Sequence, residues 1–272
     1  MGEIATVVSV MGDDAYHEMA SISLPSFLKN NVSADLFIFT DDVGKMSKLR
    51  SFGLDRVHVI DMLERFRENK DMIEDLTRKG LSEEEMRKHA EFYGHFYRQI
   101  FISSLIPIAE DYLKDKKYSH ILKIDVDSYF AGGDMMLMVE EEIKKTPEAD
   151  LYLIQRTNEW MCRYGKKTPG TGFTLWRKGS HFASSYVEQF AGGFQVSVLR
   201  QRENKLVCFI ILDRPGYHFV YPFEKARQTN REFTREIASG FLPAYFHLFG
   251  KTILDKMKKL EEWFGDKTDK TA

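Results

Sequence analysis

Cysteine and long apolar runs are both scarce in this chain of 272 residues. Cys162 and Cys208 are the only cysteines, and their separation offers neither a metal-binding nor a redox pair. We therefore expect no disulfide framework, and we expect the protein to reside in a reducing compartment. No apolar run approaches the length of about 18 residues that a membrane-spanning helix needs. The first residues also lack the basic start of a secretory signal, so the sequence predicts a cytoplasmic protein.

An excess of charge of one sign is also missing. The chain has 39 Lys and Arg residues against 41 Asp and Glu residues, a formal net charge of −2. A protein that binds a nucleic acid backbone needs a concentrated positive field, so nucleic acid is not an expected partner. The hydrophobic fraction of 43% is ordinary for a globular protein. We expect a single domain over residues 1–265, followed by a polar tail over residues 266–272.

Several well-known nucleotide and hydrolase motifs are absent. No strand is followed by Gly-x-Gly-x-x-Gly, and no Gly-x-x-x-x-Gly-Lys-Ser/Thr loop occurs, which disfavours Rossmann dehydrogenases and P-loop nucleotidases. The Gly-x-Ser-x-Gly nucleophile elbow is missing too. Phosphatases of the haloacid dehalogenase type usually open on an Asp-x-Asp strand. Here such a motif lies mid-chain and is followed by Ser128 and Tyr129, which argues against that class.

What the sequence does contain is an alternation of short apolar runs and helical segments. This alternation is typical of an α/β fold with a largely parallel sheet. The second half is less regular, with a loop running into a strand over residues 170–177. The runs predicted as strands are 5–11, 36–40, 57–60, 121–124, 151–154, 206–212 and 219–221, and the predicted helices are 17–29, 63–95, 97–112 and 253–264.

Acidic residues follow four of the predicted strands: Asp13, Asp41, Asp61 and Asp125. Ligands of open α/β sheets bind beyond the carboxyl ends of strands. Aspartate also favours turns and helix caps for purely local reasons. We interpret Asp41 and Asp61 as turn or cap residues.

The most informative motif is the run from Lys123 to Ser128, which contains Asp125 and Asp127 at the end of a buried strand. If the backbone stays extended, both carboxylates point to the same side, because side chains alternate with period two. Neighbouring carboxylates repel each other unless a cation lies between them. Hard oxygen ligands suit Mg²⁺ or Mn²⁺. The alternative interpretation is a turn with capping residues.

Four segments together resemble the glycogenin and bacterial lipopolysaccharide galactosyltransferase family, which has a GT-A fold. Residues 7–24 are similar to its opening strand, acidic turn and helix, and Phe96-Tyr97-Arg98 is similar to its aromatic-x-Arg. The Asp125-Val126-Asp127 motif resembles its metal site. The run from His247 to Lys251 resembles its His-x-x-Gly-x-x-Lys region.

This resemblance implies an α/β GT-A fold with a mixed, mostly parallel central sheet flanked by helices. It also implies an enzyme dependent on Mn²⁺ (or Mg²⁺) that moves a hexose, with retention, from a nucleotide-diphosphate sugar to a hydroxyl. The donor is expected to be a UDP-hexose, and the acceptor a glycan, a glycolipid or a protein. The implied donor-binding residues are Asp13, Asp14, Tyr16, Arg98, Gly250 and Lys251; the metal ligands are Asp125, Asp127 and His247; and Arg98, Gln195 and Asp213 are candidates beside the reacting sugar.

The sequence departs from the family pattern in several places. The central Asn-x-Gly loop reads Pro169-Gly170-Thr171-Gly172, and the expected Asp-Gln pair reads Phe194-Gln195. Asp213 is a candidate substitute for the missing Asp. The Lys-Pro-Trp ending after the histidine motif is absent. The donor sugar and the catalytic side chains therefore stay open, as does membership of another GT-A family.

Two other functions remain as alternatives. A sugar nucleotidyltransferase would need a Gly-rich basic loop near the N-terminus, which Gly12-Asp13-Asp14 does not supply. A non-catalytic module that binds nucleotide sugars or glycans would keep the fold and show no turnover.

Two further features of the sequence could serve at the surface. The aromatic residues Trp160, Tyr164 and Trp176 either stack on acceptor sugars or belong to the core, and the core is preferred. The helix over residues 253–264 carries lysines opposite an apolar stripe, which allows weak peripheral membrane contact. Packing onto the domain is preferred.

Overall fold

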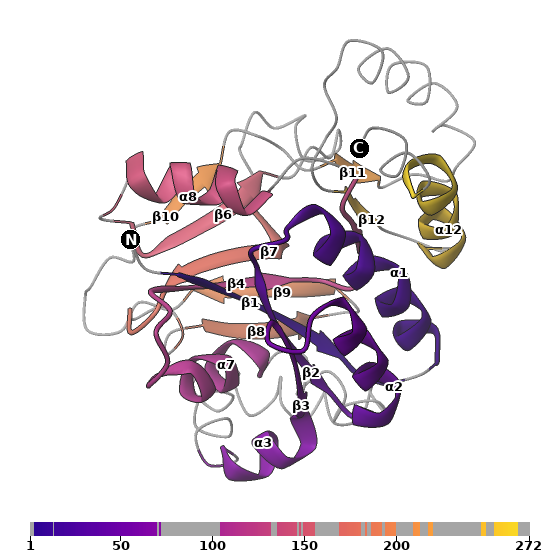
Figure 1. Cartoon of the computed structure of the whole chain (residues 1–272). Coiled ribbons are helices and arrows are strands. Elements are labelled where there is room, and N and C mark those ends of the chain that lie inside the picture. Colours follow the sequence, from indigo (N-terminus) through magenta and orange to yellow (C-terminus); the bar gives the residue numbers. More distant parts are fainter. Residues whose placement is uncertain are drawn as a thin grey trace.

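The computed structural model describes part of the chain in detail: residues 3–12, 14–69, 71, 104–131, 135–145, 147, 149–155, 169–180, 183, 186–191, 194–199, 209–212, 217–219, 246–248 and 253–265. Within these residues, seven strands form a central sheet in the order β10-β6-β7-β4-β1-β2-β3 (Figure 1). The β1, β2, β3 and β4 strands are mutually parallel, β6 and β10 are parallel to each other, and β7 is antiparallel to both β4 and β6. The strands of this sheet are β1 (Ile4–Val10), β2 (Asp35–Thr40), β3 (Val57–Asp61), β4 (His120–Ile124), β6 (Leu151–Gln155), β7 (Pro169–Arg177) and β10 (Phe209–Leu212).

Helices lie on both faces of this sheet (Figure 1). A second, three-stranded sheet has the order β11-β12-β5, and β8 pairs with β9. These strands are β5 (Ser128–Tyr129), β8 (Tyr186–Ala191), β9 (Phe194–Leu199), β11 (Tyr217–Phe219) and β12 (Phe246–Leu248). The helices are α1 (Asp14–Asn30), α2 (Val43–Ser47), the 3₁₀ helix η1 (Lys48–Phe52), α3 (Met62–Glu68), α7 (Leu105–Leu113), α8 (Met135–Lys145) and α12 (Ile253–Phe264).

The predicted α/β class and mostly parallel sheet are confirmed. The five early strands and the first and last predicted helices appear within a few residues of their expected bounds. The predicted helix over residues 97–112 overlaps α7, which tolerates Pro107 because that residue lies in the first helical turn. Residues 169–177 form a strand throughout rather than a loop leading into one.

The pleat of the parallel strands divides the core into two layers. Val8, Leu122 and Ile124 belong to a cluster that includes buried residues of α1 and α8. Val7 and Ile121, one residue away along the same strands, belong to a cluster that includes α7. Fully covered strands of this kind read as continuous apolar runs, which is why they were recognisable in the sequence.

One arginine joins three segments at the end of α1. The Arg56 guanidinium donates to the carbonyl oxygens of Leu28, Asn31, Val32 and Phe52 at 3.0–3.1 Å. Carbonyl groups at a helix C-terminus lack partners within the helix. Arg56 supplies them and thereby fixes the path of the chain into β2.

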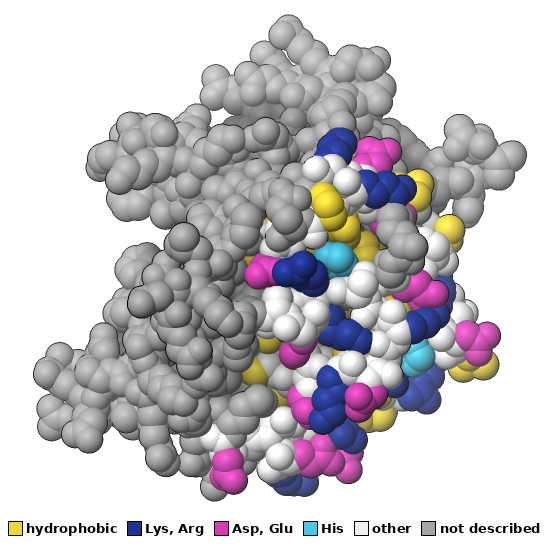
Figure 2. Space-filling view, turned by 90° about the vertical axis from the view of Figure 1, so that its left-hand side faces the viewer, with side chains coloured by type: hydrophobic (Ala, Val, Ile, Leu, Met, Phe, Trp, Pro, Cys, Tyr) yellow, Lys and Arg dark blue, Asp and Glu magenta, His cyan; other side chains and the backbone are white. Residues whose placement is uncertain are grey.

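The C-terminal helix α12 packs on the domain, as preferred from the sequence. Its Met257, Leu260 and Phe264 are buried with Met19 of α1 and Tyr129 of β5. Most of the stripe considered for membrane contact is therefore covered by protein, whereas Trp263 is 36% exposed. Within the described part of the chain, no helix combines the length and the apolar character that crossing a bilayer requires. Basic and acidic side chains are interspersed over the described part of the face in Figure 2.

Candidate functional site

The strand order places the candidate site at a topological switch point. From β1 the chain proceeds to β2 and β3 on one side, whereas β4 lies on the other side of β1. These four strands are parallel, so their carboxyl ends share one edge of the sheet. The crevice of an open α/β sheet forms where the strand order reverses in this way. Gly12 after β1 and Asp125 after β4 flank that position.

The two aspartates after β4 do not continue the strand. β4 ends at Ile124, and Val126 and Asp127 form a turn before β5 begins at Ser128. The backbone is therefore not extended from Asp125 to Asp127, so the alternation of side chains along a strand does not apply there. A turn places the two carboxylates instead. Both side chains are partly exposed, with one carboxylate oxygen of Asp127 buried. Asp125 also pairs with Lys123, whose ammonium lies 2.6 Å from Oδ1 of the carboxylate.

Gly172 continues the regular pairing of β7 with β4 and lies beside Asp125, next to an irregularity between β7 and β6. Between Leu153 and Ile154 of β6, the partner on β7 moves from Thr174 to Gly170, so the intervening residues of β7 bulge. The amide of Asp125 donates to the carbonyl oxygen of Gly172 at 3.1 Å. Bulges of this kind are common next to active sites, where they redirect the chain. The glycine that was compared with the family loop thus lies next to the Asp-x-Asp turn.

His247 reaches the same place from the other end of the sequence. β12 runs antiparallel to β5, and His247 is the register partner of Ser128, the residue after Asp127. On its other side, β12 is parallel to β11, with His218 as the register partner of His247. The three-stranded sheet therefore lines up Ser128, His247 and His218. Sequence reasoning did not single out His218, although it predicted a strand over residues 219–221, because only the pairing of β11 with β12 sets it beside His247.

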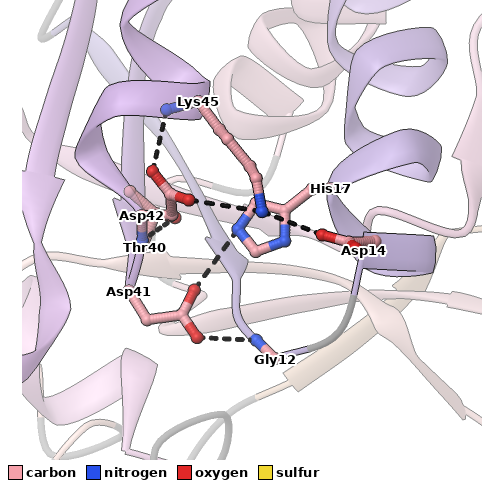
Figure 3. Close-up of polar contacts among 7 residues, drawn as sticks. All are labelled: Gly12, Asp14, His17, Thr40, Asp41, Asp42 and Lys45. Carbon is pink, nitrogen blue, oxygen red and sulfur yellow. Dashed lines mark hydrogen bonds and ion pairs between the residues drawn. The ribbon is translucent and has the colours of Figure 1, made fainter.

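A second polar cluster lies at the ends of β1 and β2 (Figure 3). Asp41 accepts a hydrogen bond from the amide of Gly12 at 2.8 Å and lies 3.3 Å from Nε2 of the buried His17. Asp41 therefore ties the turn after β1 and helix α1 to the end of β2. Asp41 lies in the bend after β2, as expected of a turn residue, but both of its partners lie on segments distant in sequence. Asp61, in contrast, is confirmed as a cap: it accepts from the amides of Leu63 and Glu64 at the start of α3.

Lys45 completes this cluster (Figure 3). Its ammonium lies 2.8 Å from Asp14 and 3.3 Å from Asp42. The hydrogen bond from Lys45 lowers the pKa of Asp14, and the backbone amide of Lys45 lowers the pKa of Asp42. The two carboxylates together raise the pKa of Lys45. Lys45 of α2 thus places a positive charge beside Asp14 and Asp42.

Several predicted site residues are placed only in part. Tyr16 is half-buried and packs against two groups of buried residues: the core layer that includes α1 and α8, and the cluster that contains Met257 of α12. Gln195 lies in β9, paired with Phe190. Trp176 is a core residue as preferred: it is fully buried and donates from Nε1 to Glu110 at 2.7 Å. The predictions for Asp13, Arg98, Asp213, Gly250 and Lys251, and for Trp160 and Tyr164, lie outside the described residues.

Comparison with known proteins agrees with this architecture. No protein-family profile and no curated protein sequence matches the chain. Among solved structures, mouse xyloside xylosyltransferase 1 in its apo form aligns with a TM-score of 0.53 at 13% identity, over 92% of this chain and 98% of that one. The glycosyltransferase GlyE of Streptococcus pneumoniae TIGR4 aligns with a TM-score of 0.46 at 12% identity, over 97% of this chain and 64% of that one.

The chain adopts a GT-A fold. At the carboxyl end of β4 the Asp-x-Asp turn lies beside Gly172 of β7, and β12 of the three-stranded sheet pairs with β5, the strand that follows the turn. Among the side chains that the structure describes, no group of three potential metal ligands lies together. The backbone register adds His247 next to the turn of this GT-A sheet. If the two carboxylates and the imidazole bound one ion, a donor set of oxygen and nitrogen would suit Mn²⁺ better than Mg²⁺.

Proposed function

We propose that the chain is a metal-dependent glycosyltransferase that moves a hexose from a nucleotide-diphosphate sugar, a UDP-sugar, to a hydroxyl of a glycan, lipid or protein. The observation that carries the proposal is the register between His247 and Ser128. This register sets the strand of His247, more than a hundred residues further along the chain, beside the residue that follows Asp127. The likeness to a protein named as a xylosyltransferase supports the proposal at the level of fold.

Each part of this edge has a role in the proposal. Asp125, Asp127 and His247 would hold Mn²⁺, which supplies positive charge for the departing diphosphate. The turn between β1 and α1, with Asp14 and Tyr16, would contact the nucleoside. Arg98 and Lys251 remain predicted partners of the donor, and Gln195 remains a predicted contact of the reacting sugar. Because the family that the sequence resembles retains the configuration of its donor, we expect retention of the anomeric configuration.

Thermal unfolding in the presence of UDP tests the donor and the metal together. Ligand at about 100 times its dissociation constant stabilises the folded state by roughly 2.7 kcal/mol. For a chain of this length that corresponds to a rise in Tm of about 5 °C. We expect the rise with UDP and Mn²⁺ together, and not with UDP in chelator. Equal shifts under both conditions would rule out the metal bridge, and a shift with GDP alone would rule out uridine.

The Asp127→Asn variant tests whether the turn binds the metal. It keeps the shape of the side chain and removes its charge, so the shift that depends on Mn²⁺ should disappear. Asp115→Asn is the matched control, because Asp115 lies in the exposed loop before β4, at the opposite end of that strand. If both variants keep the shift, Asp127 is a turn residue only.

Turnover separates an enzyme from a binding module on the same fold. A glycosyltransferase releases UDP from its donor in the presence of Mn²⁺, at a rate that Asp127→Asn lowers. Binding without any release would support the non-catalytic module instead. Proton NMR of the first product decides the stereochemistry: we expect an α-linked product from an α-linked donor, and a β-anomer would reject retention.

A further inference from the structure

A buried lysine lies within the central sheet, directly before the Asp-x-Asp turn. The side chain of Lys123 on β4 is 3% exposed, and the side chain of its partner Asp125 is 31% exposed. Lysine is almost never buried unless it is paired, because moving an ammonium group out of water is costly. Lys123 therefore needs a carboxylate at this position, and Asp125 supplies it.

The pleat of β4 explains how the two side chains meet. Leu122 and Ile124 belong to the core layer beneath α1, and Ile121 belongs to the layer beneath α7. Alternation along the strand puts Lys123 on the same face as Ile121. From there its ammonium donates to Oδ1 of Asp125 at 2.6 Å. Lys123 thus reaches the first carboxylate of the turn from inside the protein, while the Asp125 side chain keeps 31% of its surface exposed.

This pairing changes the charge that a divalent ion would meet. Asp125 and Asp127 together carry two negative charges, and the ammonium of Lys123 offsets one of them. A buried charge is screened much less by solvent and salt than an exposed one. Lys123 therefore opposes the arrival of a second cation at Asp125 more strongly than a surface lysine at the same distance would. It also holds the carboxylate in one position before any ion binds.

We propose that Lys123 is a positioning residue that competes with the divalent ion for Asp125. Mn²⁺ alone then binds the free protein weakly, and it binds well only with a nucleotide diphosphate, whose negative charge offsets the ammonium. This inference rests on the proposed function, since it takes Asp125 and Asp127 as metal ligands. It adds that the motif is set for the complex of metal and nucleotide rather than for the bare ion.

Binding of Mn²⁺ measured by electron paramagnetic resonance tests this without any assay of turnover. The signal of free Mn²⁺ is titrated against wild type, Lys123→Met, Lys123→Gln and Lys123→Arg, first with Mn²⁺ alone and then with added UDP. Removing the cation should tighten binding of Mn²⁺ alone by about tenfold or more. Lys123→Arg keeps the charge and should match wild type. Added UDP should increase Mn²⁺ affinity more in wild type than in the two neutral variants.

The controls separate this inference from the proposed function. Asp127→Asn should lose Mn²⁺ binding; if it binds like wild type, the metal site itself is wrong. If Asp127→Asn loses binding while the folded neutral variants bind Mn²⁺ no more tightly than wild type, only the role of Lys123 is overturned. Circular dichroism establishes which variants fold. Two neutral replacements of different polarity are used so that the failure of one to fold leaves the other to decide.

Discussion

The contact of Asp41 with Gly12 allows a direct test of whether the turn after β1 binds a nucleotide. Replacing Asp41 with alanine removes a charged acceptor that lies 2.8 Å from the Gly12 amide and 3.3 Å from His17. A hydrogen bond to a charged group contributes roughly 1.5–3 kcal/mol. The Asp41 side chain is 26% exposed, and water can partly replace it, so we expect a loss of about 1–2 kcal/mol.

The chain length converts this loss into a change in melting temperature. An unfolding entropy of about 2.1 cal/mol/K per residue predicts a drop in Tm of about 2–4 °C for Asp41→Ala. The turn from Gly12 to Asp14 also becomes less fixed. If that turn contacts the nucleoside, the Kd for UDP measured with Mn²⁺ by calorimetry should rise by roughly tenfold, which is about 1.4 kcal/mol.

Asp61→Ala provides a matched control. Asp61 also lies at the carboxyl end of a parallel strand. Its carboxylate caps helix α3, whereas that of Asp41 holds the turn after β1. Loss of a helix cap costs about 1 kcal/mol, so both variants should lose comparable stability. Only Asp41→Ala should weaken UDP binding. Equal changes in Kd for both variants, or an unchanged Kd for Asp41→Ala, would refute the role of the turn.

Three further predictions concern stability. Arg56→Ala removes four hydrogen bonds to backbone carbonyl groups and should cost about 2–4 kcal/mol in urea unfolding, with Arg56→Lys in between; a loss within error would contradict the bridging role. Phe27→Ala empties a fully buried site against Phe130 and should cost about 3–5 kcal/mol, whereas Phe27→Leu should cost much less. Burial, aided by Arg177, lowers the pKa of His120. Just below a pH of about 6.5 the unfolded chain therefore binds more protons than the folded chain, and the free energy of unfolding decreases as the pH decreases. His120→Gln should flatten the difference in unfolding free energy between pH 7 and pH 5; an unchanged difference would show that His120 does not contribute.

Short local patterns were enough for much of the fold. The buried strands β1, β2 and β4 are nearly continuous apolar runs, and α1 carries apolar residues at helical spacing. Such signals arise from neighbouring residues, so they can be recognised without knowing what the segment packs against. The same holds for Asp61, whose role as a cap depends only on the amides two and three residues later.

Other features depend on partners that are distant in the chain. Strands of two or three residues, such as β5 and β12, are too short to carry a periodic signal. The antiparallel direction of β7 and its bulge at Gly172 arise from pairing with β4 and β6. Asp41 has the sequence context of a turn residue, yet its carboxylate contacts Gly12 and His17 on other segments.

The candidate site divides in the same way. The sequence alone shows that Asp125 and Asp127 follow a buried strand and that a histidine and glycine motif lies near residue 250. The pairing of β12 with β5, which sets the strand of His247 beside the turn, is visible only in the folded structure. Lys123 likewise looked like one polar residue in an apolar strand, and the structure decided that it is buried against Asp125. Residue types and local spacing can be read directly from the sequence, whereas charge pairing and burial depend on which distant segments the fold brings together.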